Sequence, residues 1–370
     1  MKIERIELHH IQMPLVHPFR TSFGVERKRP CILVEIQSEG ITGWGEVAAG
    51  LGPWYSSETM ETAWHILRDY LAPFLLGKSI ETTADIAPIF KAVRGHPMAK
   101  AGIENAVWDV LAKAQGKPLS AMLGGVRDRV EVGVSIGIQP TIEALLDRVD
   151  SFVAAGYGRI KMKISPDWLI EPVRLVRERY PDVRLMADAN SAFTLADAPL
   201  LKQLDPFGLI MIEQPLGYDD IADHALLQRE LQTAVCLDES IHSVADARAM
   251  VALQAGRIIN MKVGRVGGFS NALEIHDIAQ QAGIPLWCGG MLETGIGRAA
   301  NIHLASLPNF TLPGDISATD RYYAEDIAEP PFVLNKADST MAVPTGAGIG
   351  VEVMRDRVEK ARLRYLDIGR

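Results

Sequence analysis

The sequence predicts an α/β protein: a (β/α)7β barrel of the TIM type that carries a smaller α+β domain, which the carboxy-terminal tail completes. From Val130 onward, short apolar segments alternate with helical patterns, an order typical of parallel strands. The residues before this point instead place strands ahead of helices, as in an α+β domain. Acidic residues also recur at a constant spacing at the ends of successive predicted strands, which places them on one rim of a closed barrel.

The amino-terminal part, residues 1–125, is predicted to form a capping domain. Alternating apolar residues indicate a strand at 2–13, and a Ser-Glu-Gly turn joins two further strands at 30–37 and 42–48. Helical periodicity then predicts helices at 57–75, 81–92 and 98–115.

Three residues of the last predicted helix, Glu104, Trp108 and Asp109, could suggest a site. We interpret them as helix surface and packing, without a functional role.

A long segment, residues 14–24, connects the first two predicted strands and mixes proline, glycine and aromatic residues. Loops of this length are uncommon unless they are functional. Phe19 and Phe23 are apolar rings in a turn-rich segment, so we expect a lid over the site rather than a variable surface loop.

The barrel is predicted over residues 126–320, and residues 321–370 are expected to return to the capping domain. Eight strand and helix units close into a barrel whose active site lies at the carboxyl ends of the strands. The Gly-rich run at 345–350 is not followed by a Lys-Ser or Lys-Thr pair, so we do not interpret it as a nucleotide loop. The barrel strands are expected near 131–138, 159–164, 183–188, 208–213, 234–238, 257–262, 284–288 and 310–314.

Three carboxylates, Asp188, Glu213 and Asp238, each end an apolar run. Their separations are equal (213 − 188 = 25 and 238 − 213 = 25), about the length of one strand, one helix and two loops in such a barrel. Three carboxylates without histidine or cysteine form an all-oxygen site. Such a site suits one Mg²⁺ (or Mn²⁺) ion and disfavours zinc.

Lysines surround this acidic ring. Lys161 and Lys163 alternate along one predicted strand and so share a face, and Lys262 ends a later strand. Any one of them alone could be a solvated lysine, but buried charges persist only when they are paired or bound to metal. Desolvation and neighbouring cations lower the pKa of an amine, so we expect general bases that act near neutral pH.

The order of these residues, Lys-x-Lys, then Asp, Glu and Asp-Glu at strand ends, then Lys, resembles the enolase superfamily in its muconate-lactonizing subgroup. The resemblance covers essentially the whole chain. Within the subgroup, residues 161–163, 261–268 and 307–315 are similar to o-succinylbenzoate synthases that also racemise N-succinylamino acids. The resemblance implies removal of a proton next to a carboxylate with stabilisation of the enediolate, applied to a dehydration in menaquinone biosynthesis and to racemisation.

The resemblance also implies roles for single residues. Lys163 and Lys262 would flank the substrate carbon: in dehydration Lys163 is the base and Lys262 a charge-stabilising ammonium, and in racemisation both exchange protons. Asn190 resembles a substrate contact, although an Asx turn at a strand end is an equal alternative. Glu239 resembles the acid that steadies Lys262. The aromatic turn at 49–55 would form the other half of the lid.

Further residues are expected around the substrate. Arg265 follows Lys262 by three positions and could lower the pKa of that lysine by repulsion, whereas the alternative is a solvated loop arginine. Lys161, Asn190, Glu239 and Arg265 are therefore the expected supporting residues. The expected substrate-binding residues are Ser135, Phe19, Phe23, Gly290, Met291 and Glu293.

Related activities are the main alternatives. A dipeptide epimerase is expected to carry an Asp-x-Asp pair after the last strand, and this chain has Asp315 alone there. A muconate cycloisomerase stays open, and an acid-sugar dehydratase is disfavoured because Lys262 stands where a histidine base is common. A non-catalytic binding barrel is the alternative from another class, and the complete set of acids and lysines disfavours it.

Composition limits the partners. A formal net charge of −8 and a pI near 5.7 argue against nucleic acid as a partner. The first residues alternate like a strand, unlike a signal peptide, and no apolar run reaches membrane length. We therefore expect a cytoplasmic homo-oligomer that acts on a small carboxylate, with Cys31, Cys236 and Cys288 reduced.

Overall fold

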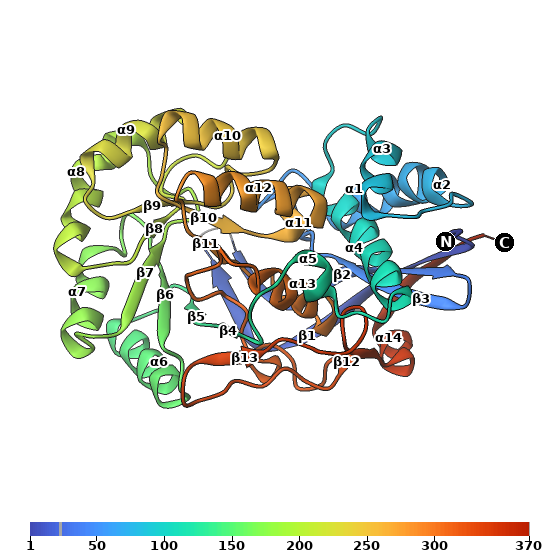
Figure 1. Ribbon diagram of the computed structural model, residues 1–370. Coiled ribbons are helices and arrows are strands. Elements are labelled where there is room, and N and C mark those ends of the chain that lie inside the picture. Colours follow the sequence, from blue (N-terminus) through green and yellow to red (C-terminus); the bar gives the residue numbers. More distant parts are fainter. Residues whose placement is uncertain (22–23, 370) are drawn as a thin grey trace.

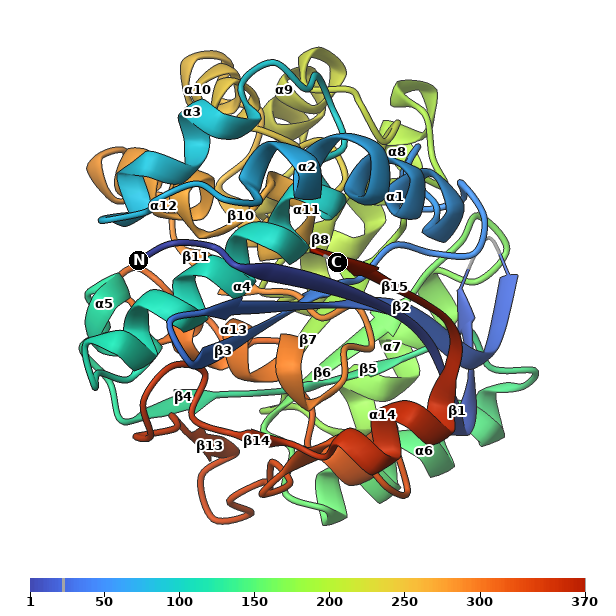
Figure 2. The same ribbon diagram turned by 90° about the vertical axis from the view of Figure 1, so that its right-hand side faces the viewer.

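The computed structural model describes residues 1–21 and 24–369. Figure 1 shows a barrel of strands surrounded by helices beside a second part, in which an antiparallel sheet packs against helices. Both chain ends lie on this second part (Figures 1 and 2). The predicted fold class, a barrel with a capping domain completed by the tail, is confirmed.

The capping sheet has four antiparallel strands in the order β15-β1-β2-β3. The long helix α4 (Pro97–Ala114) packs closely on β3. A Cβ atom on Gly43 or Gly45 would lie 2.4 and 2.0 Å from backbone oxygens of this helix, so the close approach requires glycine at both positions. The strands are β1 (Arg5–Thr21), β2 (Gly24–Ser38), β3 (Ile41–Val47) and β15 (Arg362–Ile368).

The segment 14–24 was expected to be a loop, and this expectation is wrong for the residues that the structure describes there, 14–21 and Gly24. β1 and β2 continue as a hairpin in which Thr21 pairs with Gly24, with a register shift between Pro14 and Phe19. Prolines are tolerated where a ladder is irregular, so they interrupt the hairpin without ending it. Phe23 lies outside the described residues, which leaves Phe19 as the member of the predicted aromatic pair that can be placed.

The helices of the capping domain lie within the three predicted helical ranges or just after them. Thr59 caps the first one by accepting a hydrogen bond from the backbone N–H of Thr62. The elements are α1 (Met60–Ile66), the π-helical turn η1 (Leu67–Leu71), α2 (Ala72–Leu75), the 3-10 turn η2 (Thr83–Asp85), α3 (Ile86–Phe90), α4, and α5 (Leu119–Leu123).

The interpretation of Glu104 and Asp109 as helix surface is wrong. Both carboxylates are buried, because α4 lies between the sheet and the barrel. Asp109 accepts hydrogen bonds from the backbone N–H groups of Trp44 and Ile349, each at 2.8 Å. This aspartate thus joins the capping sheet to the carboxy-terminal segment.

Seven barrel strands form one parallel sheet in the order β11-β10-β9-β8-β7-β6-β5. They are β5 (Val134–Ile136), β6 (Arg159–Lys163), β7 (Arg184–Asp188), β8 (Ile212–Glu213), β9 (Val235–Leu237), β10 (Ile258–Met261) and β11 (Leu286–Cys288). The helices around them are α6 (Ile142–Ala154), α7 (Ile170–Arg179), α8 (Ala198–Leu201), α9 (Ala222–Glu230), α10 (Val244–Leu253), α11 (Val263–Val266), α12 (Phe269–Gln281) and α13 (Gly295–Ala305), with 3-10 turns η3 (Leu195–Asp197) and η4 (Lys202–Phe207).

The ends of the barrel sheet depart from the prediction. β4 (Arg129–Glu131) leaves the barrel and pairs with β13 (Thr340–Ala342). The expected eighth strand, near 310–314, contributes two isolated bridges instead, Leu286 with Phe310 and Val132 with Gly314, one toward each edge strand. Pro313 has no N–H to donate to a ladder, which explains why this segment closes the barrel without forming a regular strand.

The carboxy-terminal segment returns to the capping domain. Its last strand, β15, pairs antiparallel with β1, so that Ile368 lies opposite Ile6, and Figure 2 shows the two strands side by side. The segment consists of η5 (Thr319–Arg321), β12 (Ala328–Glu329), β13, β14 (Glu352–Val353), α14 (Arg355–Ala361) and β15.

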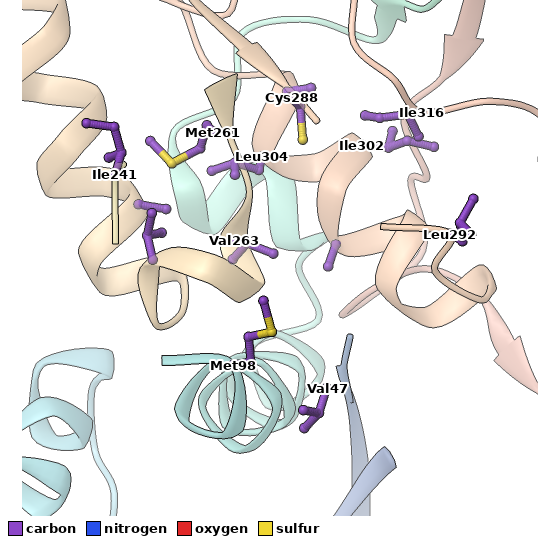
Figure 3. Close-up of a cluster of buried hydrophobic side chains, with 14 of the residues drawn as sticks. Val47, Met98, Ile241, Met261, Val263, Cys288, Leu292, Ile302, Leu304 and Ile316 are labelled. Atoms are coloured by element: carbon purple, nitrogen blue, oxygen red, sulfur yellow. The ribbon is translucent and has the colours of Figure 1, made fainter. Parts of the chain in front are cut away.

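The two parts share a hydrophobic core. In Figure 3, Met98 of α4 lies next to Val263 of the barrel, and both belong to one buried cluster with Val47 of β3 and Met261 of β10. Burying apolar side chains from both parts in one core fixes their relative position. Loops of the capping domain are therefore held over the barrel rim. None of the described helices is both long and apolar enough to span a membrane.

Glu35 of β2 should make folding stability depend on acid pH. Arg355 donates to both of its oxygens, at 2.5 and 3.0 Å, and the His9 ring lies 3.4 Å away. Burial acts to raise the pKa of Glu35, but hydrogen bonds from His9 and Arg355 lower it from 4.5 to about 2. A lowered folded-state pKa stabilises the protein above the unfolded-state pKa, and this contribution is lost as the pH falls toward the folded value.

We therefore expect the stability advantage of wild type over Glu35→Gln, measured by urea unfolding, to be largest near neutral pH and to shrink between about pH 5 and pH 2. Glu359→Gln, an exposed position on α14, is the matched control and should differ little from wild type throughout. A Glu35→Gln difference that does not change with pH would contradict this account.

Candidate active site

The parallel register brings the predicted site residues onto neighbouring strands. Ser135 lies beside Lys161, Lys163 beside Asp188, and Asp188 beside Glu213. A cavity of about 270 Å³ lies over this rim, and residues of both parts line it. The lining residues are Phe19, Gly24, Val25, Glu26, Arg29, Gly50, Leu51, Gly52, Trp54, Tyr55, Ser135, Lys161, Lys163, Asn190, Lys262, Gly290, Met291, Leu292, Asp315 and Tyr322.

The carboxylates of Asp188, Glu213 and Asp238 are at most 1% exposed. The Lys161 Nζ atom lies 3.0 Å from an oxygen of Asp188 and 3.0 Å from one of Glu213. Burial, and then repulsion by Asp188, raises the pKa of Glu213 to about 7. Burial acts in the same direction on Asp188, but the Lys163 and Lys161 ammonium groups hold its pKa well below the usual range. The lysine ammonium groups therefore stabilise the charged form of Asp188 more than that of Glu213.

Lys163 is held by two side chains of the β7 end. Its Nζ donates to Asp188 Oδ2 at 2.6 Å and to Asn190 Oδ1 at 2.5 Å. Asn190 has a positive φ of 43°, its backbone N–H donates to Asp188 Oδ1, and its amide donates to Glu239 Oε1 at 2.9 Å. The Asx turn at this strand end is therefore formed by the Asp188 side chain, whereas the Asn190 side chain contacts Lys163 and Glu239. The substrate contact of Asn190 stays a prediction.

Lys262 lies at the end of β10, immediately before α11. Its Nζ donates to Asp238 Oδ2 at 2.8 Å and to the Tyr55 hydroxyl at 3.0 Å, and it lies 4.4 Å from the centre of the Tyr55 ring. The expected lowering of the lysine pKa is wrong here. Burial does act to lower the pKa of Lys262, but Tyr55, Glu239 and Glu213 raise it above the ordinary value, because they stabilise the ammonium.

Arg265 is buried and contacts Asp238. Its NH1 donates to Asp238 Oδ1, its Nε to the Ile241 carbonyl and its NH2 to the Asn260 carbonyl. The alternative of a solvated loop arginine is excluded, since the side chain is 1% exposed. Asp238 is therefore surrounded by Arg265, Lys262 and Tyr55.

The comparisons with known proteins agree along the whole length. Residues 5–124 match the family described as mandelate racemase / muconate lactonizing enzyme, N-terminal domain, and residues 144–357 match the enolase C-terminal domain-like family. The chain belongs to the enolase superfamily. The predicted superfamily and its mandelate racemase and muconate lactonizing branch are confirmed.

Relatives of this superfamily member are similar over their full lengths. An o-succinylbenzoate synthase of Geobacillus stearothermophilus is 52% identical over 97% of this chain and 96% of its own. An N-succinylamino acid racemase of an Amycolatopsis species is 50% identical over the whole of both chains. A solved enolase superfamily structure from Listeria innocua superposes with a TM-score of 0.95 at 43% identity, over 99% of this chain and 98% of that one.

Enolase superfamily members use a divalent metal ion, as a dipeptide epimerase of Cytophaga hutchinsonii solved with Mg illustrates (TM-score 0.92, 26% identity, full coverage of both chains). The donors at this rim fit such an ion. They are three buried carboxylates without a thiol or imidazole among them, which is the chemistry of a hard cation. Their charge is balanced by Lys161, Lys163, Lys262 and Arg265.

The predicted pocket residues of this superfamily member fall into three groups. Phe19, Ser135, Gly290 and Met291 line the cavity, and the Ser135 hydroxyl has no hydrogen-bond partner within the described part of the chain. Glu293 supports the loop instead, by accepting hydrogen bonds from the Met291 N–H at 2.7 Å and the Asn301 amide at 2.9 Å. Phe23 lies outside the described residues.

Three residues of the site were not among the predicted site residues. Tyr55 contacts Lys262, Asp315 contacts Lys161, and Arg159 contacts Asp315. Arg159 lies two and four positions before Lys161 and Lys163 on β6, so the alternation that grouped the lysines would have found it. Asp315 entered the sequence analysis only as a single acid at the place where a dipeptide epimerase is expected to carry an acidic pair. Tyr55 comes from the capping domain, and its contact with Lys262 depends on how the two parts pack.

Phe19 provides a test of the expected lid. Its ring is partly buried and lines the cavity, so Phe19→Ala should raise KM about tenfold or more while changing kcat less, as the loss of uniform apolar binding does. Val16→Ala is the matched control, because Val16 lies on the same strand, is 42% exposed and lines a different hollow. If Phe19→Ala had the same KM and kcat as wild type, the hairpin would not act as a lid over the site.

Proposed function

We propose that this protein is an o-succinylbenzoate synthase that dehydrates a succinyl-bearing cyclohexadiene carboxylate, and that it also racemises N-succinylamino acids. The observation that carries the proposal is the pair of buried lysines, Lys163 and Lys262, that line one cavity above three buried carboxylates. Similarity over the full length to proteins with these two activities supports it.

The proposed metal ligands are Asp188, Glu213 and Asp238, for one Mg²⁺ (or Mn²⁺) ion. Bound there, the ion would act as a Lewis acid on the substrate carboxylate and stabilise the charge that develops as the α-proton leaves. The residues of the chain would bind, orient and exchange protons around it. Lys161, Asn190, Glu239 and Arg265 are proposed to hold the lysines and carboxylates in place, as their contacts support.

Both proposed reactions begin with transfer of the α-proton to a lysine amine. In dehydration, Lys163 takes this proton and passes it to the departing hydroxyl group, which leaves as water as the double bond forms, and Lys262 remains an ammonium. The surroundings that raise the pKa of Lys262 support that cationic role. In racemisation, one lysine removes the α-proton from one face and the other returns a proton to the opposite face.

Asp315 argues against the dipeptide epimerase alternative. Its carboxylate lies 2.6 Å from Arg159 NH1 and 2.5 Å from Lys161 Nζ, so its charge is already balanced by two buried cations. A substrate with a free α-ammonium group would have to compete with both. An N-acylated amino acid carries no such charge, which supports the racemase activity on N-succinyl substrates.

One set of assays tests the proposal. The purified protein is incubated with Mg²⁺ or Mn²⁺ and, separately, with the cyclohexadiene substrate, N-succinylamino acids, cis,cis-muconate and dipeptides. We expect turnover of the first two, loss of it with a chelator, and little with the others. Preferred turnover of muconate or dipeptides, or no metal-dependent turnover of any of them, would overturn it. The homo-oligomeric state stays a prediction that the elution volume of the same preparation would test.

A further inference from the structure

A chain of buried charges runs across the barrel interior at the level of Lys161. The Lys161 Nζ atom lies 2.5 Å from Asp315 Oδ2, and Arg159 NH1 lies 2.6 Å from Asp315 Oδ1. Arg159 is fully buried and Asp315 is 6% exposed. Lys161 and Asp315 both line the cavity, so one end of this chain of charges faces the substrate.

Trp287 of β11 forms the apolar floor beneath the two cations. The Lys161 ammonium lies 4.9 Å and the Arg159 guanidinium 5.5 Å from its ring centre. A ring face attracts cations in a desolvated site. Arg159 also donates to the carbonyls of Val134 and Pro313, which fixes the guanidinium between the first barrel strand and the closing segment.

Lys161 has two kinds of carboxylate partner. Asp188 and Glu213, at 3.0 Å, belong to the proposed metal ligands, so their oxygens cannot serve Lys161 fully once they hold an ion. Asp315 lies on the opposite, closing side of the barrel and is held by Arg159. It is therefore the carboxylate that stays available to Lys161 in every state of the site.

We propose that Asp315, itself held by Arg159, is a positioning residue that fixes the Lys161 ammonium toward the substrate and limits how fully it pairs with the proposed metal ligands Asp188 and Glu213. The inference rests on the proposed function and deepens it, because it assigns a role to the last acid of the barrel. Without this partner, Lys161 would pair more fully with Asp188 and Glu213 and would compete with the divalent ion for them. Burying a charge requires such a dedicated partner.

The test compares Asp315→Asn with Asp320→Asn, an exposed aspartate five residues further along, in two measurements. Titration calorimetry with Mg²⁺ on the apo-protein should show affinity reduced about tenfold in Asp315→Asn. Steady-state kinetics should show kcat/KM lower by about a hundredfold, the usual cost of a misplaced group. A role in folding alone would change the unfolding midpoint and leave both quantities per folded molecule unchanged.

Arg159 provides the matching variants. Arg159→Lys should retain more Mg²⁺ affinity and kcat/KM than Arg159→Met, because a cation still faces Asp315. If Asp315→Asn does not fold, the charge-balanced double variant Arg159→Met with Asp315→Asn replaces it, since removing both partners avoids an unpaired buried charge.

Mg²⁺ affinity equal to that of Asp320→Asn would overturn the inference. This calorimetric measurement needs no substrate, so it separates failure of the inference from failure of the proposed activity.

Discussion

Removal of either cavity lysine is expected to stop racemisation while sparing proton exchange with one enantiomer. In D₂O, the wild-type enzyme given either enantiomer of an N-succinylamino acid should incorporate deuterium at the α-carbon and form the other enantiomer. Lys163→Ala should still exchange the α-proton of the one enantiomer that presents this proton to Lys262. Lys262→Ala should exchange the α-proton of the other enantiomer, through Lys163. The reason is geometric: Lys163 is held by Asp188 on β7 and Lys262 by Asp238 beyond β9, so we expect each to face one side of the carbon.

The expected loss is large, because a positioned general base contributes about a hundredfold to ten-thousandfold. Proton NMR of the α-position and chiral chromatography measure exchange and racemisation separately. Lys202→Ala is the control, since this lysine is 55% exposed and should behave as wild type. Racemisation at the wild-type rate in either variant, or exchange of the same enantiomer in both, would refute the two-base arrangement and turn attention to Lys161.

The charged ring of the site could be predicted from the sequence, because the two-residue period of a strand and the constant spacing of the acids indicate it directly. Strand alternation puts Lys161 and Lys163 on one face, and equal spacing of acids puts Asp188 and Glu213 on one rim. The structure brings these four residues into contact. In a barrel, residues two positions apart in one strand share a face, and residues at the ends of successive strands lie on one rim. The short-range sequence pattern is therefore sufficient to predict these contacts.

Contacts between distant segments could not be predicted in this way. Tyr55 reaches Lys262 across 207 positions and Asp315 reaches Arg159 across 156. The direction of the Lys262 pKa shift depends in part on the first of these contacts. Glu239 and Glu213 were expected near this lysine, but the sequence does not place the Tyr55 phenol that also opposes the effect of burial. The hairpin at 14–24 was missed for a similar reason: prolines suggest a loop locally, while pairing with β2 keeps the segment extended.

The structure also shows why the rim can bury so many charges. Four of the buried rim carboxylates have a cationic partner: Asp188 has Lys163, Glu213 has Lys161, Asp238 has Lys262 and Arg265, and Asp315 has Arg159. Removing one member leaves its partner buried and unpaired, which costs more than the pair contributes. A substitution at the rim is therefore expected to change both the stability of the apo-protein and its affinity for the proposed metal ion, and the two effects must be measured separately.

Asp238→Asn is expected to abolish activity and to weaken divalent-ion binding by at least about a hundredfold, because even residues that only support a ligand contribute ten- to a hundredfold. The fold should survive, since Asp238 lies at the rim and the hydrophobic core is untouched. Lys262 and Arg265 would keep their neutral partners, the Tyr55 hydroxyl and the Ile241 and Asn260 carbonyls, but would lose the anionic charge of Asp238. The apo-variant should therefore also unfold at lower denaturant concentration than apo-wild type.

The measurement that isolates the metal is therefore the difference between unfolding with and without Mg²⁺. At about a hundred times Kd, a ligand that binds only the folded state adds about 2.7 kcal/mol to stability, and we expect this gain in wild type and in the exposed control Asp219→Asn. In Asp238→Asn, whose Kd is expected to be at least about a hundredfold higher, the gain should fall to about 0.4 kcal/mol or less at the same Mg²⁺ concentration. An unchanged gain, together with unchanged calorimetric Mg²⁺ affinity, would remove Asp238 from the proposed ligands and leave it as the counter-ion of Lys262 and Arg265.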